Sequence, residues 1–172
     1  MSDNGEVPID TTIPGWPWRQ GSFGWVEPTA WAILAFEAGG RGDHPRAEEG
    51  RRLLLDRSID TGGWNYGNRE AFDQELVPFW DTTALAILAL GKSFRDDKIA
   101  KGLDFLERNL GDIASPYSLA LSLLALEAGN RSVPGAKERL RGLLMDGHQV
   151  PGNSVAVSWA LLALGPRKVF PP

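Results

Sequence analysis

Aromatic side chains are the residues of this sequence best suited to bind a ligand. The 172 residues include seven Trp but only two Tyr, in a chain otherwise rich in Ala and Leu. Eight aromatic residues fall in predicted loops or at predicted helix starts: Trp16, Trp18, Phe23, Trp25, Trp64, Tyr66, Phe79 and Trp80. Gathered around one opening, such rings could line an apolar pocket for a polyisoprenoid or another hydrocarbon. The alternative is structural, since loop Trp residues such as Trp25 and Trp64 can tie consecutive helical hairpins together.

The composition excludes several other kinds of site. The chain has no Cys, which excludes disulfides, zinc–thiolate sites, iron–sulfur clusters and thiol nucleophiles. The two histidines, His44 in a predicted helix start and His148 in a predicted loop, lack metal-ligand spacing, so we expect no metal and no cofactor. The 18 Lys and Arg residues against 22 Asp and Glu give a net charge of −4 and no basic face for nucleic acid.

The elements that must position the aromatic rings form an internal repeat. Nearly the same tetrapeptide recurs at spacings of 54, 36 and 38 residues: Ile33–Phe36, Ile87–Leu90, Leu123–Leu126 and Leu161–Leu164. These runs are apolar on most sides, which is typical of buried helices. The segments between them are apolar on one face only, as Ile99, Leu103 and Leu106 show. The pattern predicts an all-α array of helical hairpins with an inner and an outer layer.

Capping residues punctuate the predicted helices. Asp81, Ser115 and Asn153 are expected N-caps, and Pro28 and Pro116 suit a first helical position. A glycine follows each inner helix, where a left-handed C-terminal cap is expected: Gly39, Gly91, Gly129 and Gly165. The last inner helix is predicted over Ser154–Leu164.

Three inner runs resemble a known superfamily. Glu27–Phe36, Asp81–Leu90 and Ser115–Leu126 resemble the inner helices of the terpenoid cyclase and protein prenyltransferase α/α-toroids. The segment Gly50–Trp64 fits the spacing of the QW motif of squalene–hopene cyclases, with Leu53 replacing the aromatic residue and Ser58 replacing the Gln. The segment Lys101–Leu106 resembles the first half of a further copy of this motif, and Gly21–Trp25 resembles the end of another. The resemblance spans Trp16 to Gly165 and implies a partial α/α-toroid-type array, about half to two-thirds of a ring.

Within that superfamily, the resemblance leaves one kind of chemistry open. The zinc site of the prenyltransferases needs a Cys, and Asp96–Ala100 lacks the third carboxylate of a DDxxD box, so Asp96 is expected to cap a helix. Class II cyclases protonate an alkene or epoxide with the middle Asp of a DxDDTA motif. The nearest string is Phe79–Ala84, on which Asp81 matches the proton donor while Phe79 and Thr82 replace the flanking carboxylates.

Asp81 also has a purely structural interpretation. A general acid must be protonated, whereas the helix dipole and the backbone N–H donors at an N-cap favour the ionised form. A lone Asp that caps its helix is therefore the competing assignment. Whether the chain is an enzyme stays open; as one, it would be a class II terpenoid cyclase-like isomerase or lyase.

The resemblance implies a squalene/terpene cyclase-like repeat domain, not catalytically complete alone, that binds an isoprenoid or other apolar ligand once assembled. The alternative is a non-catalytic helical-repeat scaffold for protein–protein interaction. The candidate catalytic residue is Asp81. The candidate substrate-binding residues are Trp16, Phe23, Trp25, Trp64, Tyr66, Phe79 and Trp80.

We expect a single repeat domain over residues 1–172, with a flexible segment at 1–15 and a tail at 166–172. Four inner and three outer helices leave the C-terminal helix without an outer partner. We therefore expect self-association, a partner subunit or a longer chain to cover it. Met1–Pro17 lacks the features of a secretory signal, and no apolar stretch approaches transmembrane length. These features predict a cytoplasmic protein, with a peripheral position at a membrane left open.

Overall fold

The computed structural model describes residues 9–71, 74–91, 96–145, 153–166 and 170, and its described part is all-α, as predicted. Its helices are α1 (Val26–Ala38), α2 (Pro45–Asp56), α3 (Trp80–Ala89), α4 (Asp97–Asn109), α5 (Pro116–Ala128), α6 (Ala136–Met145) and α7 (Ser154–Leu164). A 3-10 turn follows α4 at Leu110–Asp112, and two short strands, β1 (Glu70–Ala71) and β2 (Gln74–Glu75), pair antiparallel. His148 and the loop around it lie outside the described residues.

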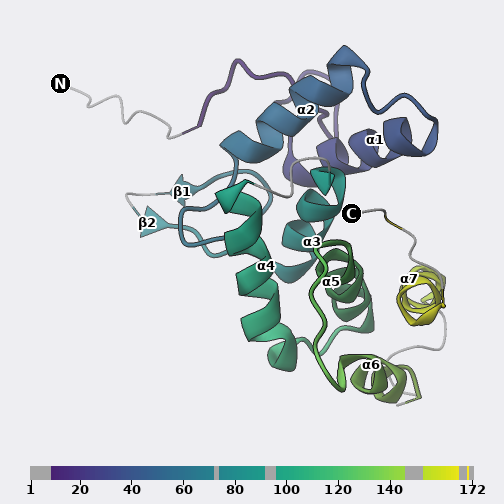
Figure 1. The fold of residues 1–172 in the computed structure, drawn as a ribbon. Helices are drawn as coiled ribbons and strands as arrows, with labels where there is room; N and C mark the ends of the chain where they lie inside the picture. Colours follow the sequence, from purple (N-terminus) through teal and green to yellow (C-terminus); the bar gives the residue numbers. More distant parts are fainter. Residues whose placement is uncertain (1–8, 72–73, 92–95, 146–152, 167–169, 171–172) are drawn as a thin grey trace.

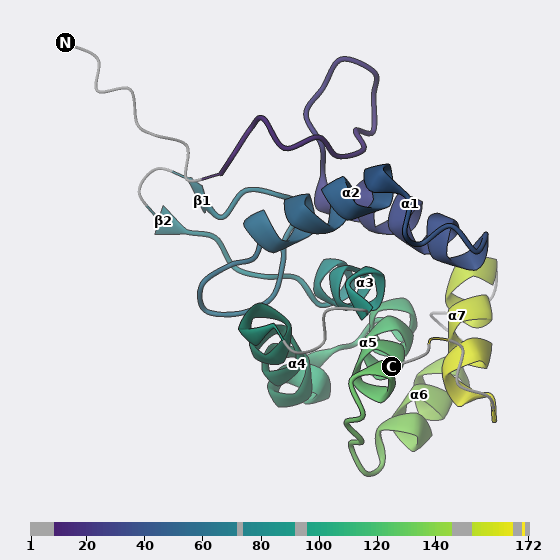
Figure 2. The same cartoon turned by 45° about the horizontal axis from the view of Figure 1, so that its top comes forward.

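The helices form the two layers that the repeat predicts. The inner helices α1, α3, α5 and α7 pack side by side in chain order, while the outer helices α2, α4 and α6 lie against α1, α3 and α5 (Figure 1, Figure 2). The outer helix α4 buries Ile99, Leu103 and Leu106 and exposes Lys101 and Asp104 to water. The inner helices α3 and α5 are instead buried on most sides, because most of their residues are apolar or small, whereas α1 and α7 bury only four and three residues.

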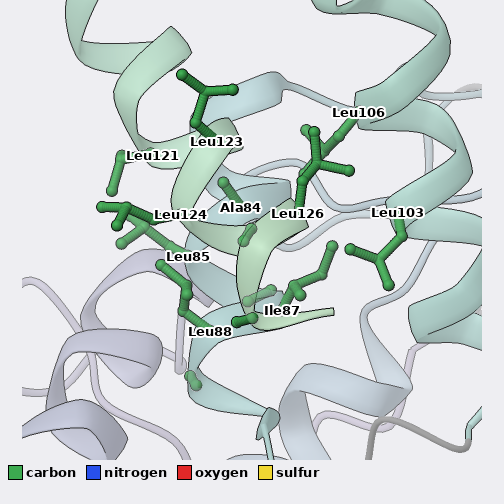
Figure 3. Close-up of a cluster of buried hydrophobic side chains, with 14 of the residues drawn as sticks. Ala84, Leu85, Ile87, Leu88, Leu103, Leu106, Leu121, Leu123, Leu124 and Leu126 are labelled. Atoms are coloured by element: carbon green, nitrogen blue, oxygen red, sulfur yellow. The ribbon is translucent and has the colours of Figure 1, made fainter. Parts of the chain in front are cut away.

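The core lies where α3, α4 and α5 meet. Figure 3 shows Leu85 and Ile87 of α3 among Leu103 of α4 and Leu124 of α5, and all four are buried. Each such side chain contributes about 1.5–3 kcal/mol when it is removed from water. This packing fixes α3, α4 and α5 relative to one another.

The predicted N-caps are confirmed at three positions and wrong at one. The side chains of Asp96, Ser115 and Asn153 each accept a hydrogen bond from a backbone N–H of the first turn that follows. Asp81 is instead the second residue of α3, whose N-cap is Phe79. The Phe79 backbone N–H donates to the Trp64 carbonyl (2.9 Å), so a contact between two loops sets the start of the helix.

A loop contact also moves the start of α1. The Trp25 N–H donates to the Trp16 carbonyl (3.1 Å), and Trp25 is the N-cap. Pro28 therefore occupies the third helical position rather than the first, whereas Pro116 takes the first position of α5 as predicted.

Left-handed caps follow α1 and α5, and each lies one residue beyond the predicted glycine. Gly39 and Gly129 end α1 and α5 with φ of −82° and −75°, and the left-handed residues are Gly40 (φ +67°) and Asn130 (φ +56°). In both loops the next N–H, from Arg41 or Arg131, donates to a carbonyl of the last helical turn at 2.8 Å. This pairing is the Schellman motif, in which the left-handed residue follows the C-cap.

The helix α7 has an uncovered outer side. Leu161 and Leu162 are 66% and 39% exposed, whereas the matching Leu123 and Leu124 of α5 are buried. On its other side, Trp159 of α7 meets Trp31 of α1 with ring centroids 5.6 Å apart, so the first and last inner helices touch. No helix in the described residues is long and apolar enough to cross a membrane.

Candidate ligand-binding site

Trp64, a predicted substrate-binding residue, lies in the core rather than at a site. It is fully buried, and its indole N–H donates to the carbonyl of Leu54 in α2 (2.6 Å). Its backbone N–H donates to Oγ1 of Thr83 in α3 (2.8 Å), and its ring packs on Gly102 of α4. Trp64 therefore joins three helices, which is the structural role weighed against ligand binding for the loop Trp residues.

Trp16 repeats this arrangement one hairpin earlier. Its backbone N–H donates to Oγ1 of Thr29 in α1 (2.9 Å), and its ring packs on Gly50 of α2. The guanidinium of Arg46 covers the other part of the ring, 4.6 Å from its centroid. Trp16 and Trp64 therefore each connect consecutive hairpins through packing contacts and hydrogen bonds.

Three of the other predicted aromatic residues line one hollow, which we call the aromatic groove. It has a volume of about 200 Å³, and its lining is Trp25, Asn65, Tyr66, Asn68, Leu76, Val77 and Phe79. The rings of Tyr66 and Phe79 are 5.1 Å apart, and both are exposed to solvent. Phe23 lies beside the groove, with its ring 4.7 Å from that of Trp25.

Loop hydrogen bonds hold the aromatic groove in place. The Tyr66 carbonyl accepts from the N–H of Val26, which attaches this loop to the start of α1 (3.0 Å). Asn65 is buried, and its amide accepts from the Gly67 N–H (2.9 Å) and donates to the Asn68 carbonyl (2.6 Å). Since backbone groups already satisfy this amide, the groove presents mainly apolar surface to a ligand.

Trp80, the last predicted aromatic residue, does not line the aromatic groove. It begins α3, is half-buried and packs against the core. Trp18, which belongs to the same loop-borne set, is 63% exposed and is not part of the lining either.

Asp81 lies near two polar residues that the sequence reasoning missed, Glu27 and Tyr117. Burial raises the pKa of Glu27, a hydrogen bond with the Trp31 side chain lowers it, and the charge of Asp81 raises it further. Burial raises the pKa of Tyr117 to about 12, and the charges of Glu27 and Asp81 contribute to that shift. The three residues occupy the same position in three successive inner helices, at spacings of 54 and 36 residues. That spacing is the signal that could have identified them.

The aromatic groove and the carboxylates lie at the same ends of α1 and α3. Trp25 and Phe79 are the N-caps of these helices, and Glu27 and Asp81 follow each of them by two residues. Asp81 itself accepts a hydrogen bond from the Thr82 N–H (2.9 Å). The described residues contain no group of three His, Cys, Asp or Glu side chains that could hold a metal ion.

Comparison with known proteins adds no further constraint on function. The sequence matches no protein-family model, and searches of the curated proteins and of the solved structures give no match.

Proposed function

We propose that this chain is a terpene cyclase-like helical-repeat domain that binds an isoprenoid or another apolar ligand at the aromatic groove. The observation that carries the proposal is the meeting of Trp25, Tyr66 and Phe79 around one hollow at the N-terminal ends of α1 and α3. Trp25 and Phe79 are at helix starts and Tyr66 is in a loop, and backbone hydrogen bonds of the connecting loops hold them there. The exposed rings offer a ligand apolar surface that water otherwise covers.

The size and chemistry of the aromatic groove favour part of a hydrocarbon chain as ligand. At about 200 Å³ the hollow is smaller than the 300–1,000 Å³ typical of enclosed ligand pockets, so it would hold a segment of a longer molecule. Burial of apolar surface contributes about 25 cal/mol per Å², so the affinity would depend on the area that the rings cover. A ligand that extends from the aromatic groove past the starts of α1 and α3 would also come close to the carboxylates of Glu27 and Asp81.

Proton transfer is the reaction that this neighbourhood would support. Asp81 keeps the place that the cyclase resemblance gives to the proton donor. Glu27 adds a second carboxyl, and its raised pKa favours the protonated form that a general acid requires. This extension of the proposal depends on ligand binding and is tested after it.

Fluorescence titration with farnesol, a short isoprenoid alcohol, tests ligand binding. Trp25 is expected to report the titration because it lines the aromatic groove. Phe79→Ala should weaken farnesol binding about tenfold, since the loss of one aromatic contact is worth about 1–2 kcal/mol. Trp18→Ala is the matched control, because it removes an exposed ring outside the groove. Equal affinity of Phe79→Ala and the unaltered protein would refute the proposal.

The exposed side of α7 favours a second candidate function, that of a protein-binding scaffold. Val155, Leu161 and Leu162 are exposed apolar side chains of α7, and exposed apolar surface of this kind marks protein–protein contacts in other proteins. Light scattering after size-exclusion chromatography measures whether copies of the chain cover it. A mass above that of the monomer, reduced to the monomer by Leu161→Asp, is the expected result, and a monomer at all concentrations would argue against self-association.

A further inference from the structure

Two hairpins of the array repeat the same charged residues, yet they differ in the space between their helices. Glu37, Glu48 and Arg51 of the α1–α2 hairpin recur, each 90 residues later, as Glu127, Glu138 and Arg141 of the α5–α6 hairpin. The Schellman loops that connect the helices align at the same offset. The two hairpins can therefore be compared residue by residue.

In the α1–α2 hairpin, Arg51 fills the space between the helices. Its Nη2 lies 2.5 Å from Oε1 of Glu37 and donates to the Gly42 carbonyl (2.9 Å). Its Nη1 pairs with Glu48 at 3.1 Å, and the side chain is only 5% exposed. This ion-paired guanidinium closes the hairpin.

In the α5–α6 hairpin the equivalent space is open. Arg141 pairs with Glu138 (2.8 Å) but not with Glu127, and its side chain is 52% exposed. Glu127 lies instead 3.9 Å from Nζ of Lys137. A cavity of about 320 Å³ remains, lined by these charged side chains and by Leu123, Leu126 and Val133.

The two hairpins differ at several positions around this space: Phe36, Gly42 and Ala47 of the α1–α2 hairpin correspond to Leu126, Ser132 and Lys137 of the α5–α6 hairpin. A Cβ atom on Gly42 would displace the carboxylate of Glu37 from the place where it pairs with Arg51. The equivalent residue in the α5–α6 hairpin is Ser132, which also lines the cavity and carries a Cβ. Glu127 pairs with Lys137 rather than with Arg141, so the ion pair that closes the α1–α2 hairpin has no counterpart in the α5–α6 hairpin.

The charges around the cavity are balanced and exchangeable. Lys137 and Arg141 supply two cations, and Glu127 and Glu138 supply two carboxylates. Arg131 also lines the cavity, but Asp104 (2.5 Å) and Glu107 (3.0 Å) of α4 already hold its guanidinium. Exposed ion pairs add little to stability, so a ligand with its own charges can replace them at little cost.

We propose that the cavity between α5 and α6 binds a small zwitterion with an apolar body, of the class of the apolar amino acids. The ligand carboxylate pairs with Arg141 and Lys137, its ammonium group pairs with Glu127, and its side chain lies on Leu123, Leu126 and Val133. The cavity volume falls within the range of small-molecule sites, about 300–1,000 Å³. This site is separate from the aromatic groove, so its test is independent of farnesol binding.

Calorimetric titration with three probes of the same carbon skeleton tests the assignment. Leucine carries both charges, 4-methylpentanoate carries only the carboxylate, and 3-methylbutylamine carries only the ammonium group. Leucine is expected to bind saturably and at least about tenfold tighter than either half-ligand, because only leucine pairs with both the cationic and the anionic side chains of the cavity. Equal binding of 4-methylpentanoate would overturn the zwitterion assignment, as would the absence of saturable leucine binding.

Variants of the chain test the geometry. Arg141→Ala and Glu127→Gln should each weaken leucine binding about tenfold, whereas Arg52→Ala, an exposed change on α2, should not alter it. Ser132→Gly restores the glycine of the α1–α2 hairpin, so it should let Glu127 approach Arg141 and weaken leucine binding. Undiminished leucine binding in both single variants, Ser132→Gly and Arg141→Ala, would refute the proposal. Circular dichroism verifies that each variant is folded.

Discussion

The indole of Trp64 rests directly on Gly102 of α4. A Cβ atom on Gly102 would lie 2.8 Å from Cζ3 of Trp64 and 3.2 Å from Cδ1 of Ile87. The same relationship joins Trp16 to Gly50 of α2, where a Cβ atom would lie 3.0 Å from the ring. This repeated Trp–Gly contact makes Trp64 of the QW-like segment Gly50–Trp64 a packing residue. Trp16, rather than Trp25 of the segment Gly21–Trp25, occupies the equivalent position in the first hairpin.

Gly102→Ala is expected to destabilise the protein by about 1–3 kcal/mol, because the added methyl group overpacks the contact with a fully buried ring. Gly142→Ala in α6 is the matched control, since nothing lies within 4 Å of a Cβ there. That change should be stabilising by about 0.5–1 kcal/mol, because Ala favours a helix interior over Gly. Urea denaturation measures both, and equal midpoints would contradict the Trp64–Gly102 contact.

The corrected caps lead to a second prediction. Gly40→Ala should destabilise the protein by about 1–2 kcal/mol, because its φ of +67° is left-handed and a Cβ is disfavoured there. Gly39→Ala changes a residue with φ of −82° and should cost clearly less. Thermal unfolding followed by circular dichroism distinguishes the two, and a larger loss for Gly39→Ala would restore the cap position predicted from the sequence.

The raised pKa of Glu27 predicts a dependence of stability on pH. A carboxyl whose pKa is higher in the folded state binds its proton more tightly there, so its ionisation lowers stability as the pH rises. Glu27→Gln removes this loss and should stabilise the protein at pH 7. The gain should disappear below the ordinary pKa of 4.5, where Glu27 is protonated in both states.

Urea midpoints at pH 7 and at pH 4 measure the effect of Glu27→Gln. Asp112→Asn, an exposed change in the 3-10 turn after α4, is the control and should give no comparable gain. A Glu27→Gln variant less stable than the unaltered protein at pH 7 would show that the ionised carboxylate is stabilising.

The sequence predicts the helices well because their signals are local. The apolar run and the Asn153 cap define α7 at Ser154–Leu164. Segments that are apolar on most sides alternate with segments that are apolar on one face, and this alternation defines the two layers. The start of α3 could not be predicted in this way. It depends on the hydrogen bond from the Phe79 N–H to the Trp64 carbonyl, which joins residues 15 positions apart through a loop.

The candidate site could be predicted only in part for the same reason. Residue type identified Trp25, Tyr66 and Phe79, and the fold brings them together at the aromatic groove. Residue type did not distinguish them from Trp16 and Trp64, because glycines on another helix, Gly50 and Gly102, decide that these two rings are buried contacts. Glu27 and Tyr117 were missed although their register in the repeat matches that of Asp81.

Ligand-to-protein nuclear Overhauser effects with farnesol would test the account most directly. The account predicts cross-peaks from the farnesol methyl groups to the ring protons of Tyr66 and Phe79 and to those of Trp25. It predicts none to the buried ring of Trp64. Cross-peaks confined to Trp31 and Trp159, or their complete absence at saturating farnesol, would contradict the assignment of the aromatic groove as the ligand-binding site.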